Sequence, residues 1–145
     1  MTQASTSGPD GNDERAEAHR RMWQAARLRV LLVEDEANVA RLLAAELDWL
    51  GFEVRTAGDY REAITTATQW MPDLLIADIG LPGRDGWQLM RRMRQAHPKL
   101  KGVVVSGQGG PEAVAASREA GFAAHLVKPV RPEYLASTLR EVAAV

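Results

Sequence analysis

Five side chains that can bind a metal ion or a phosphate stand at the ends of short apolar runs. Glu34 and Asp35 follow the first run, Asp78 ends the third, Ser106 ends the fourth and Lys128 follows the fifth. In a chain without cysteine, oxygen ligands select a hard cation, Mg²⁺ before Ca²⁺, and Mg²⁺ commonly shares its ligand sphere with phosphate. The Lys128 ammonium adds a mobile charge that can neutralise a carboxylate or a phosphoryl oxygen. The residue types therefore predict an Mg²⁺-phosphate site if the fold brings them together.

Hydrophobic periodicity indicates the elements that must position these groups. Short apolar or β-branched runs alternate with longer stretches that carry apolar residues at helical spacing. The predicted strands are 28–33, 52–57, 73–78, 101–106 and 124–127, and the predicted helices are 37–50, 60–70, 86–97, 111–121 and 132–144. This alternation implies βαβ crossovers and an α/β doubly wound fold, with a mostly parallel sheet covered on both faces. Sites in such sheets form at the carboxyl ends of the strands, where we expect the five side chains to meet.

The pattern within each strand predicts its place in the sheet. The strand at 52–57 alternates apolar and polar residues, which suits an edge, whereas the first, third and fourth strands are continuously apolar. The side chains predicted to lie in the sheet interior are Leu32, Val33, Leu75, Ile76, Val104 and Leu126.

Two loops at the predicted site contain turn residues. Pro82 and its neighbours are expected to bend the chain away from the third strand, and Asp85 is expected to cap the helix that begins at Gly86. The loop after the fourth strand is conformationally permissive because it contains Gly107, Gly109 and Gly110. No G-x-x-x-x-G-K-[ST] or G-x-G-x-x-G motif is present, so mobility is a better interpretation of these glycines than a phosphate cradle.

Crowding of the carboxylates has a predicted electrostatic consequence. Without a metal ion, neighbouring acids raise at least one apparent pKa in the group, and a divalent cation reverses this effect. We therefore expect Asp78→Asn to stabilise the metal-free protein by removing repulsion.

Length and composition favour one folded domain. A chain of 145 residues with 46% hydrophobic composition can bury one sound core. We expect this domain at residues 28–145, preceded by a disordered or partly helical extension at residues 1–27, where too few apolar side chains offset chain entropy. The net charge of -1 does not favour nucleic acid or a membrane surface as a partner. Without a signal peptide or an apolar run long enough to span a bilayer, the chain is expected to be soluble and cytoplasmic.

Four motifs stand at the ends of the predicted strands: VLLVEDE, DLLIADIGLPGRDG, VVVSG and LVKP. In their order and separation they resemble those of a response-regulator receiver domain of the CheY-like superfamily. The resemblance covers roughly residues 29–142. It implies a flavodoxin-like (βα)5 fold with strand order 2-1-3-4-5 and a place in two-component or phosphorelay signalling.

The resemblance also implies a role for each group at the site. Asp78 would be the phosphoacceptor, and Lys128 would contact the phosphoryl group. Asp35 would bind Mg²⁺ directly and Glu34 would do so directly or through water. Asp78 and the backbone carbonyl of Gly80 would complete the protein ligands.

Further residues are assigned by the same resemblance. Ser106 would be the switch hydroxyl that hydrogen-bonds a phosphoryl oxygen, and Pro129 stands where the family often has a cis peptide bond. His125 departs from the family, which commonly has Tyr or Phe three residues before the lysine. A histidine there is compatible with a switch role and equally with a plain strand-end residue. The acidic pair is Glu-Asp where many members have two aspartates.

On this resemblance the chain takes a phosphoryl group from the phosphohistidine of a sensor histidine kinase or a histidine phosphotransfer protein onto Asp78. It then switches its binding to an unidentified downstream protein, as a monomer or as a phosphorylation-dependent dimer. It is not an enzyme apart from this self-catalysed phosphotransfer and autodephosphorylation. Because the chain ends at Val145, just after the last predicted helix, we expect no direct DNA binding. The resemblance leaves three kinds of protein open: a single-domain regulator, a phosphorelay intermediate, or the receiver of a hybrid histidine kinase.

Two other functional classes stay open. A pseudo-receiver would dock partners without gaining phosphate. An Asp-nucleophile phosphatase of the haloacid dehalogenase type would need a second acid two residues after the nucleophile, and Gly80 occupies that position.

Overall fold

Strands and helices alternate along residues 27–145, which are described by the computed structural model together with one helical turn at residues 14–17. The strands are β1 (Arg29–Val33), β2 (Glu53–Ala57), β3 (Leu74–Ala77), β4 (Lys101–Ser106) and β5 (Ala124–Val127). The helices are α2 (Ala37–Trp49), α3 (Tyr60–Trp70), α4 (Gly86–Ala96), α5 (Pro111–Ala120) and α6 (Pro132–Ala144). The predicted elements agree with these bounds. The prediction for the extension at residues 1–27 falls mostly outside the described residues.

The strands form one sheet in which every neighbouring pair is parallel, in the order β2-β1-β3-β4-β5. This confirms the predicted doubly wound fold, its strand order and the edge position of β2. Val33 of β1 pairs with Ala77 of β3. The next residues along the two strands, Glu34 and Asp78, therefore leave the sheet side by side.

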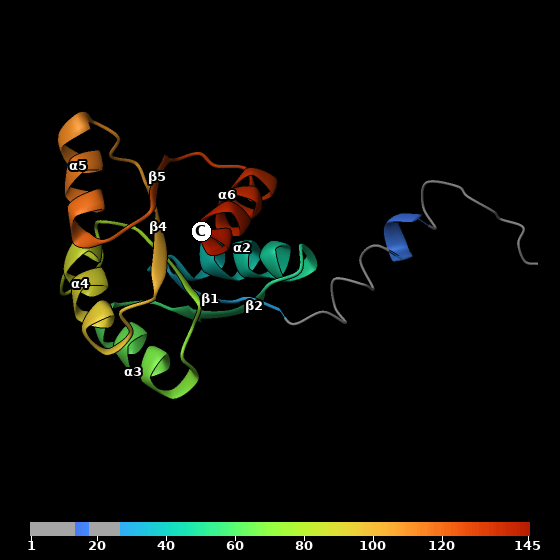
Figure 1. The fold of residues 1–145 in the computed structure, drawn as a ribbon, viewed down its shortest axis with the longest axis horizontal. Coiled ribbons are helices and arrows are strands. Elements are labelled where there is room, and N and C mark those ends of the chain that lie inside the picture. The colour runs from blue at the N-terminus through green and yellow to red at the C-terminus, as the bar shows by residue number, and fades with distance from the viewer. Residues whose placement is uncertain (1–13, 18–26) are drawn as a thin grey trace, which may run out of the picture.

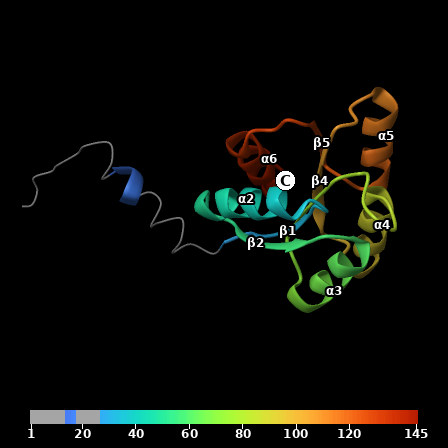
Figure 2. The same ribbon diagram turned by 180° about the vertical axis from the view of Figure 1, so that it is seen from behind.

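Helices cover both faces of the sheet, as Figures 1 and 2 show from opposite sides. Helices α2 and α6 pack on one face, while α3, α4 and α5 pack on the other. Each face has its own apolar core, because successive strand residues point to opposite sides. Leu32 and Ile76 lie in the α2-α6 core, and Leu31 and Leu75 in the other. None of the described helices is long and apolar enough to cross a membrane.

Five of the six predicted interior side chains are buried, with at most 2% exposure. These are Leu32, Val33, Leu75, Ile76 and Val104. Leu126 is the exception, since it is only partly buried against the α2-α6 core. The physical reason is that β5 forms the second edge of the sheet and has a strand on one side only.

Candidate functional site

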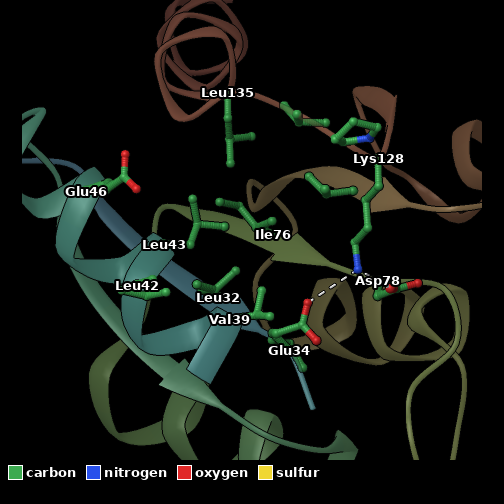
Figure 3. Close-up of a pocket in the computed structure, with 14 residues that line it drawn as sticks. Leu32, Glu34, Val39, Leu42, Leu43, Glu46, Ile76, Asp78, Lys128 and Leu135 are labelled. Atoms are coloured by element: carbon green, nitrogen blue, oxygen red, sulfur yellow. Dashed lines mark hydrogen bonds and ion pairs between the residues drawn. The ribbon is translucent and has the colours of Figure 1, made fainter. Parts of the chain in front are cut away.

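Glu34, Asp78 and Lys128 meet at the carboxyl edge of the sheet (Figure 3). The Nζ atom of Lys128 lies 2.9 Å from Asp78 Oδ2 and 3.4 Å from Glu34 Oε1. The three side chains follow β5, β3 and β1, so the parallel sheet gathers groups that are far apart in the sequence. The Lys128 ammonium thus forms ion pairs with two carboxylates.

Backbone N–H groups hold the other oxygen of each carboxylate. The N–H of Gly80 donates to Asp78 Oδ1 at 3.1 Å, and the N–H of Glu36 donates to Glu34 Oε2 at 3.1 Å. Side-chain exposure is 20% for Asp78 and 11% for Glu34. Asp78 is therefore oriented by two donors while one side remains open to solvent.

The electrostatics of the site depend on Lys128. Burial raises the pKa of Asp78, but the hydrogen bond and charge of Lys128, with the Gly80 N–H and the Ser106 hydroxyl, outweigh it, so this pKa lies below its ordinary value. Burial lowers the pKa of Lys128, but Asp78 and Glu34 outweigh it and raise this pKa above its ordinary value. Both groups are charged at neutral pH.

This result corrects the prediction made from crowding. We expected neighbouring acids to raise a pKa at the site, and for Asp78 that expectation is wrong because Lys128 is the nearest charge, at 2.9 Å. The expected stabilisation by Asp78→Asn loses its basis, since the substitution removes an ion pair.

Asp35 takes no part in the ion pairs of Lys128. Its side chain is exposed, and no hydrogen bond or ion pair joins it to another residue in the described part of the chain. Among the described residues, no group of three or more His, Cys, Asp or Glu side chains is placed to hold a metal ion. The predicted set of Glu34, Asp35 and Asp78 is thus assembled only in part. The metal-binding roles of these residues and of the Gly80 carbonyl stay predictions.

Ser106 ends β4 and is 1% exposed. Its Oγ accepts a hydrogen bond from the N–H of Gln108 at 3.1 Å, and its hydroxyl contributes to the lowered pKa of Asp78. The structure therefore brings the predicted switch hydroxyl to the predicted acceptor and bonds it to the loop after β4.

The loop between β3 and α4 is fixed by a close approach at Gly86. A Cβ at this position would lie 2.2 Å from the carbonyl oxygen of Asp78, so only glycine fits. The N–H of Gly86 donates to the Ile79 carbonyl at 2.8 Å, and Asp85 forms a capping box with Gln88 at the start of α4. The predicted cap at Asp85 is confirmed. Pro82 lies exposed on the outside of this loop.

The remaining predicted positions lie around the lysine and the loop after β4. The Lys128–Pro129 peptide bond is cis, as the family resemblance implies. Gly107 is exposed, and a Cβ built on it would meet no atom within 4 Å.

His125 is half-buried and bonded at both ring nitrogens. Its Nδ1 lies 2.8 Å from Ser117 Oγ, and its Nε2 lies 2.6 Å from the Gln108 carbonyl oxygen. The indole N–H of Trp87 donates to the same Ser117 Oγ at 2.9 Å. Sequence reasoning missed Ser117 and Trp87, because no spacing connects residues on α4, α5 and β5. Both ring nitrogens of His125 have defined partners, while its switch role stays a prediction.

An apolar hollow of about 590 Å³ opens beside the acids (Figure 3). Helices α2 and α6 form its sides, and Asp78 and Lys128 lie at one end. It leaves Val39 45% exposed and Leu42 64% exposed. Val39 and Leu42 share helical spacing with Leu47, so the three residues belong to one apolar stripe along α2. Leu47 is fully buried, whereas Val39 and Leu42 are exposed. Helical spacing predicts the stripe without showing which part of it stays uncovered.

Comparison with known proteins places this chain in a family. The model of the response regulator receiver domain matches residues 30–140. The chain belongs to the response-regulator receiver family. The chain is similar to the solved structure of a CheY-like receiver domain protein from Methanospirillum hungatei, with 27% sequence identity and a TM-score of 0.77. The match covers 82% of this chain and 95% of that protein's chain.

Two curated relatives come from Mycobacterium tuberculosis. The DNA-binding response regulator MtrA is 31% identical over 79% of this chain and 50% of its own length. The transcriptional regulatory protein PrrA is 37% identical over 70% of this chain and 43% of its own length. The chain therefore spans about half the length of these relatives or less.

The relatives overturn the prediction that there is no direct DNA binding. The exclusion of DNA rested on the chain ending soon after its last helix, and it is wrong because similar receivers occur in proteins named as DNA-binding and transcriptional regulators. The position of Val145 at the end of the sequence carries no information about DNA binding.

Proposed function

We propose that Asp78 accepts a phosphoryl group from the phosphohistidine of a histidine kinase or a phosphotransfer protein. A carboxylate oxygen of Asp78 forms a bond to phosphorus as the phosphorus–nitrogen bond breaks, and the imidazole nitrogen keeps the electron pair. The supporting observation is the ionised Asp78 carboxylate, held 2.9 Å from Lys128 Nζ at the sheet edge of a receiver-family chain. Such transfer needs mainly alignment and charge neutralisation from the protein.

The surroundings of Asp78 suit that role. Lys128 and the Gly80 N–H hold the two oxygens of the carboxylate separately. A phosphoryl group on Asp78 brings new negative charge, which the Lys128 ammonium can partly neutralise. The buried Ser106 hydroxyl then donates to a phosphoryl oxygen and changes its bonding to the loop after β4.

Mg²⁺ is the cofactor that we propose for this site, held by Asp35, Glu34, Asp78 and the Gly80 carbonyl. The donor set is entirely oxygen, as Mg²⁺ prefers. Two of these carboxylates, Glu34 and Asp78, already lie within 3.4 Å of one cationic nitrogen. When bound, the ion supplies positive charge for the phosphoryl oxygens.

Phosphorylation can be tested directly by mass spectrometry. The protein is incubated with Mg²⁺ and acetyl phosphate, and we expect the mass of one phosphoryl group to be added. Asp78→Asn should abolish this gain. Asp59→Asn is the matched control, since it changes another carboxylate that comes after a strand, where asparagine can replace the helix cap.

The same experiment separates the alternatives. A stable, stoichiometric gain that depends on Asp78 supports the proposal. Multiple turnovers of phosphomonoesters would identify a phosphatase instead. No gain in the presence of Mg²⁺ would leave a docking module that does not use phosphate. Repeating the incubation with EDTA tests the metal, because we expect labelling to be lost.

We propose that the whole protein acts in cytoplasmic signalling, with DNA binding as one output that this receiver controls. The support is that relatives of which the chain spans about half the length or less are named as DNA-binding or transcriptional regulators. A gel-shift assay with the full-length gene product, with and without acetyl phosphate, tests this output.

A further inference from the structure

A continuous hydrogen-bonded chain leads from the buried Ser106 to helix α4. The N–H of Gln108 donates to Ser106 Oγ at 3.1 Å, and the carbonyl of Gln108 lies 2.6 Å from His125 Nε2. His125 Nδ1 lies 2.8 Å from Ser117 Oγ, which accepts from the Trp87 indole N–H at 2.9 Å. We call these five residues the His125 relay.

The donors in the relay can be assigned from the chemistry of its groups. The carbonyl oxygen of Gln108 can only accept, so Nε2 of His125 must donate. In the neutral imidazole Nδ1 is then an acceptor, and the Ser117 hydroxyl donates to it. Ser117 Oγ still has a lone pair for the Trp87 N–H. A neutral His125 with the proton on Nε2 therefore satisfies every contact, which matters because Ser117 is 1% exposed.

The loop that the relay holds has few other anchors. Residues 107–110 are all exposed, and open space surrounds Gly107 and Gly110 where side chains would lie. Gly109 lies against Val127 of β5, since a Cβ there would come within 2.4 Å of a Val127 methyl group. The loop is thus tied to β5 at two neighbouring residues, Gln108 and Gly109, and His125 makes the polar tie.

The far end of the relay lies on the helical layer that α4 and α5 form side by side (Figures 1 and 2). Trp87 of α4 and Pro111 and Ala113 of α5 line a surface hollow together with Gln108. Movement of Gln108 therefore changes the shape of this surface as well as the bonding of the indole.

We propose that His125 is a positioning residue that latches the loop after β4 to α4 and α5, and that phosphorylation of Asp78 opens the latch. The second part rests on the proposed function. When Ser106 turns to donate to a phosphoryl oxygen, Gln108 loses its partner at Oγ and shifts away from His125. The signal reaches Trp87 through Ser117, a route that uses polar bonds where an aromatic side chain would use packing.

The latch itself is tested in the unphosphorylated protein by amide hydrogen exchange. Ser117→Ala removes the group that orients both His125 and Trp87, and Ser137→Ala is the control because Ser137 is an exposed serine on α6. We expect Ser117→Ala to speed exchange at the Gln108 amide, which donates to Ser106 Oγ, by about fivefold, the loss of one hydrogen bond. His125→Phe should have the same effect. Unchanged exchange in the loop, or an equal rise at all amides, would overturn the latch.

The opening is tested by NMR after the mass gain at Asp78 has been verified. We expect the indole N–H resonance of Trp87, assigned with Trp87→Phe, and the ring nitrogens of His125 to shift on phosphorylation. In Ser117→Ala the shift of the Trp87 signal should be lost while the mass gain persists. A mass gain with no shift of either signal in the native sequence would overturn the opening step. If no mass is gained, the proposed function fails, and the exchange experiment still decides the latch.

Discussion

The two loops at the site are held in different ways. The loop from Ile79 to Asp85 buries Ile79 and Leu81, presses Gly86 against the backbone of Asp78 and enters α4 through a capping box. The loop at 107–110 is exposed and enters α5 without a side-chain cap. Apolar burial and backbone contact thus fix the loop that carries the acceptor. The loop expected to respond depends on a few polar bonds, which a change at Ser106 can break.

The largest difference between the loops is expected for their glycines. Gly86→Ala should destabilise the protein by about 3 kcal/mol, because its Cβ would meet the Asp78 carbonyl at 2.2 Å and the backbone must move. Gly107→Ala should change stability by less than about 0.5 kcal/mol, since open space surrounds it. Urea unfolding measures both. Equal effects would mean that the two loops are held alike.

A second contrast concerns side chains. Ile79→Ala should cost about 2 to 4 kcal/mol, as Ile79 is 4% exposed in the core under α3 and α4. Gln108→Ala should stay within about 0.5 kcal/mol, since Gln108 bonds Ser106 and His125 through its backbone. Thermal unfolding of the pair provides the measurement. A large loss for Gln108→Ala would show that its side chain anchors the loop.

The helix starts provide a smaller contrast. Asp85→Ala removes the cap of α4 and should cost about 1 kcal/mol. Gly110→Asp adds a cap before Pro111 and a favourable charge at the start of α5, so it should stabilise by about 0.3 kcal/mol. Chemical denaturation at low ionic strength would resolve these shifts. A loss of stability in Gly110→Asp would indicate that the second loop is more constrained than its exposure implies.

A small effect is also expected at the ion pair of Asp78 and Lys128. Without divalent cations, Asp78→Asn should lower stability at pH 7 by less than about 1 kcal/mol, as for other ion pairs that are partly exposed to solvent. The pKa of Asp78 is lowered by folding, so its contribution exists above the unfolded pKa of about 4 and disappears as pH falls through the folded value. The pKa of Lys128 is raised, so its contribution exists below about 10.4 and is lost as pH rises through the folded value.

The measurement is urea unfolding of the native sequence and Asp78→Asn at pH 7 and at pH 3. The difference in unfolding midpoint between the two proteins should be smaller at pH 3 than at pH 7. A higher midpoint for Asp78→Asn at pH 7 would mean that repulsion between the acids outweighs the ion pair, as the crowding argument predicted.

Much of the fold could be predicted because its signals are local. Apolar runs and helical spacing predicted all ten elements of residues 27–145, and the βαβ alternation required a parallel sheet. The side-by-side position of Glu34 and Asp78 is a consequence of that sheet. The partial exposure of Leu126 was missed, because an apolar run does not reveal whether its strand has one neighbour or two.

The sequence by itself determined which groups the site contains: an acid at a strand end, a lysine, a hydroxyl and a glycine-rich loop. Residue type and spacing along the chain carry that information. Tertiary structure alone decided that Lys128, bonded to Asp78 at 2.9 Å, lowers the pKa of Asp78, and that Asp35 takes no part in this ion pair. It also decided that His125 joins Ser117 and Trp87. Electrostatics and hydrogen bonding depend on distances of a few ångströms between side chains from separate elements, and those distances exist only once the sheet and its helices have packed.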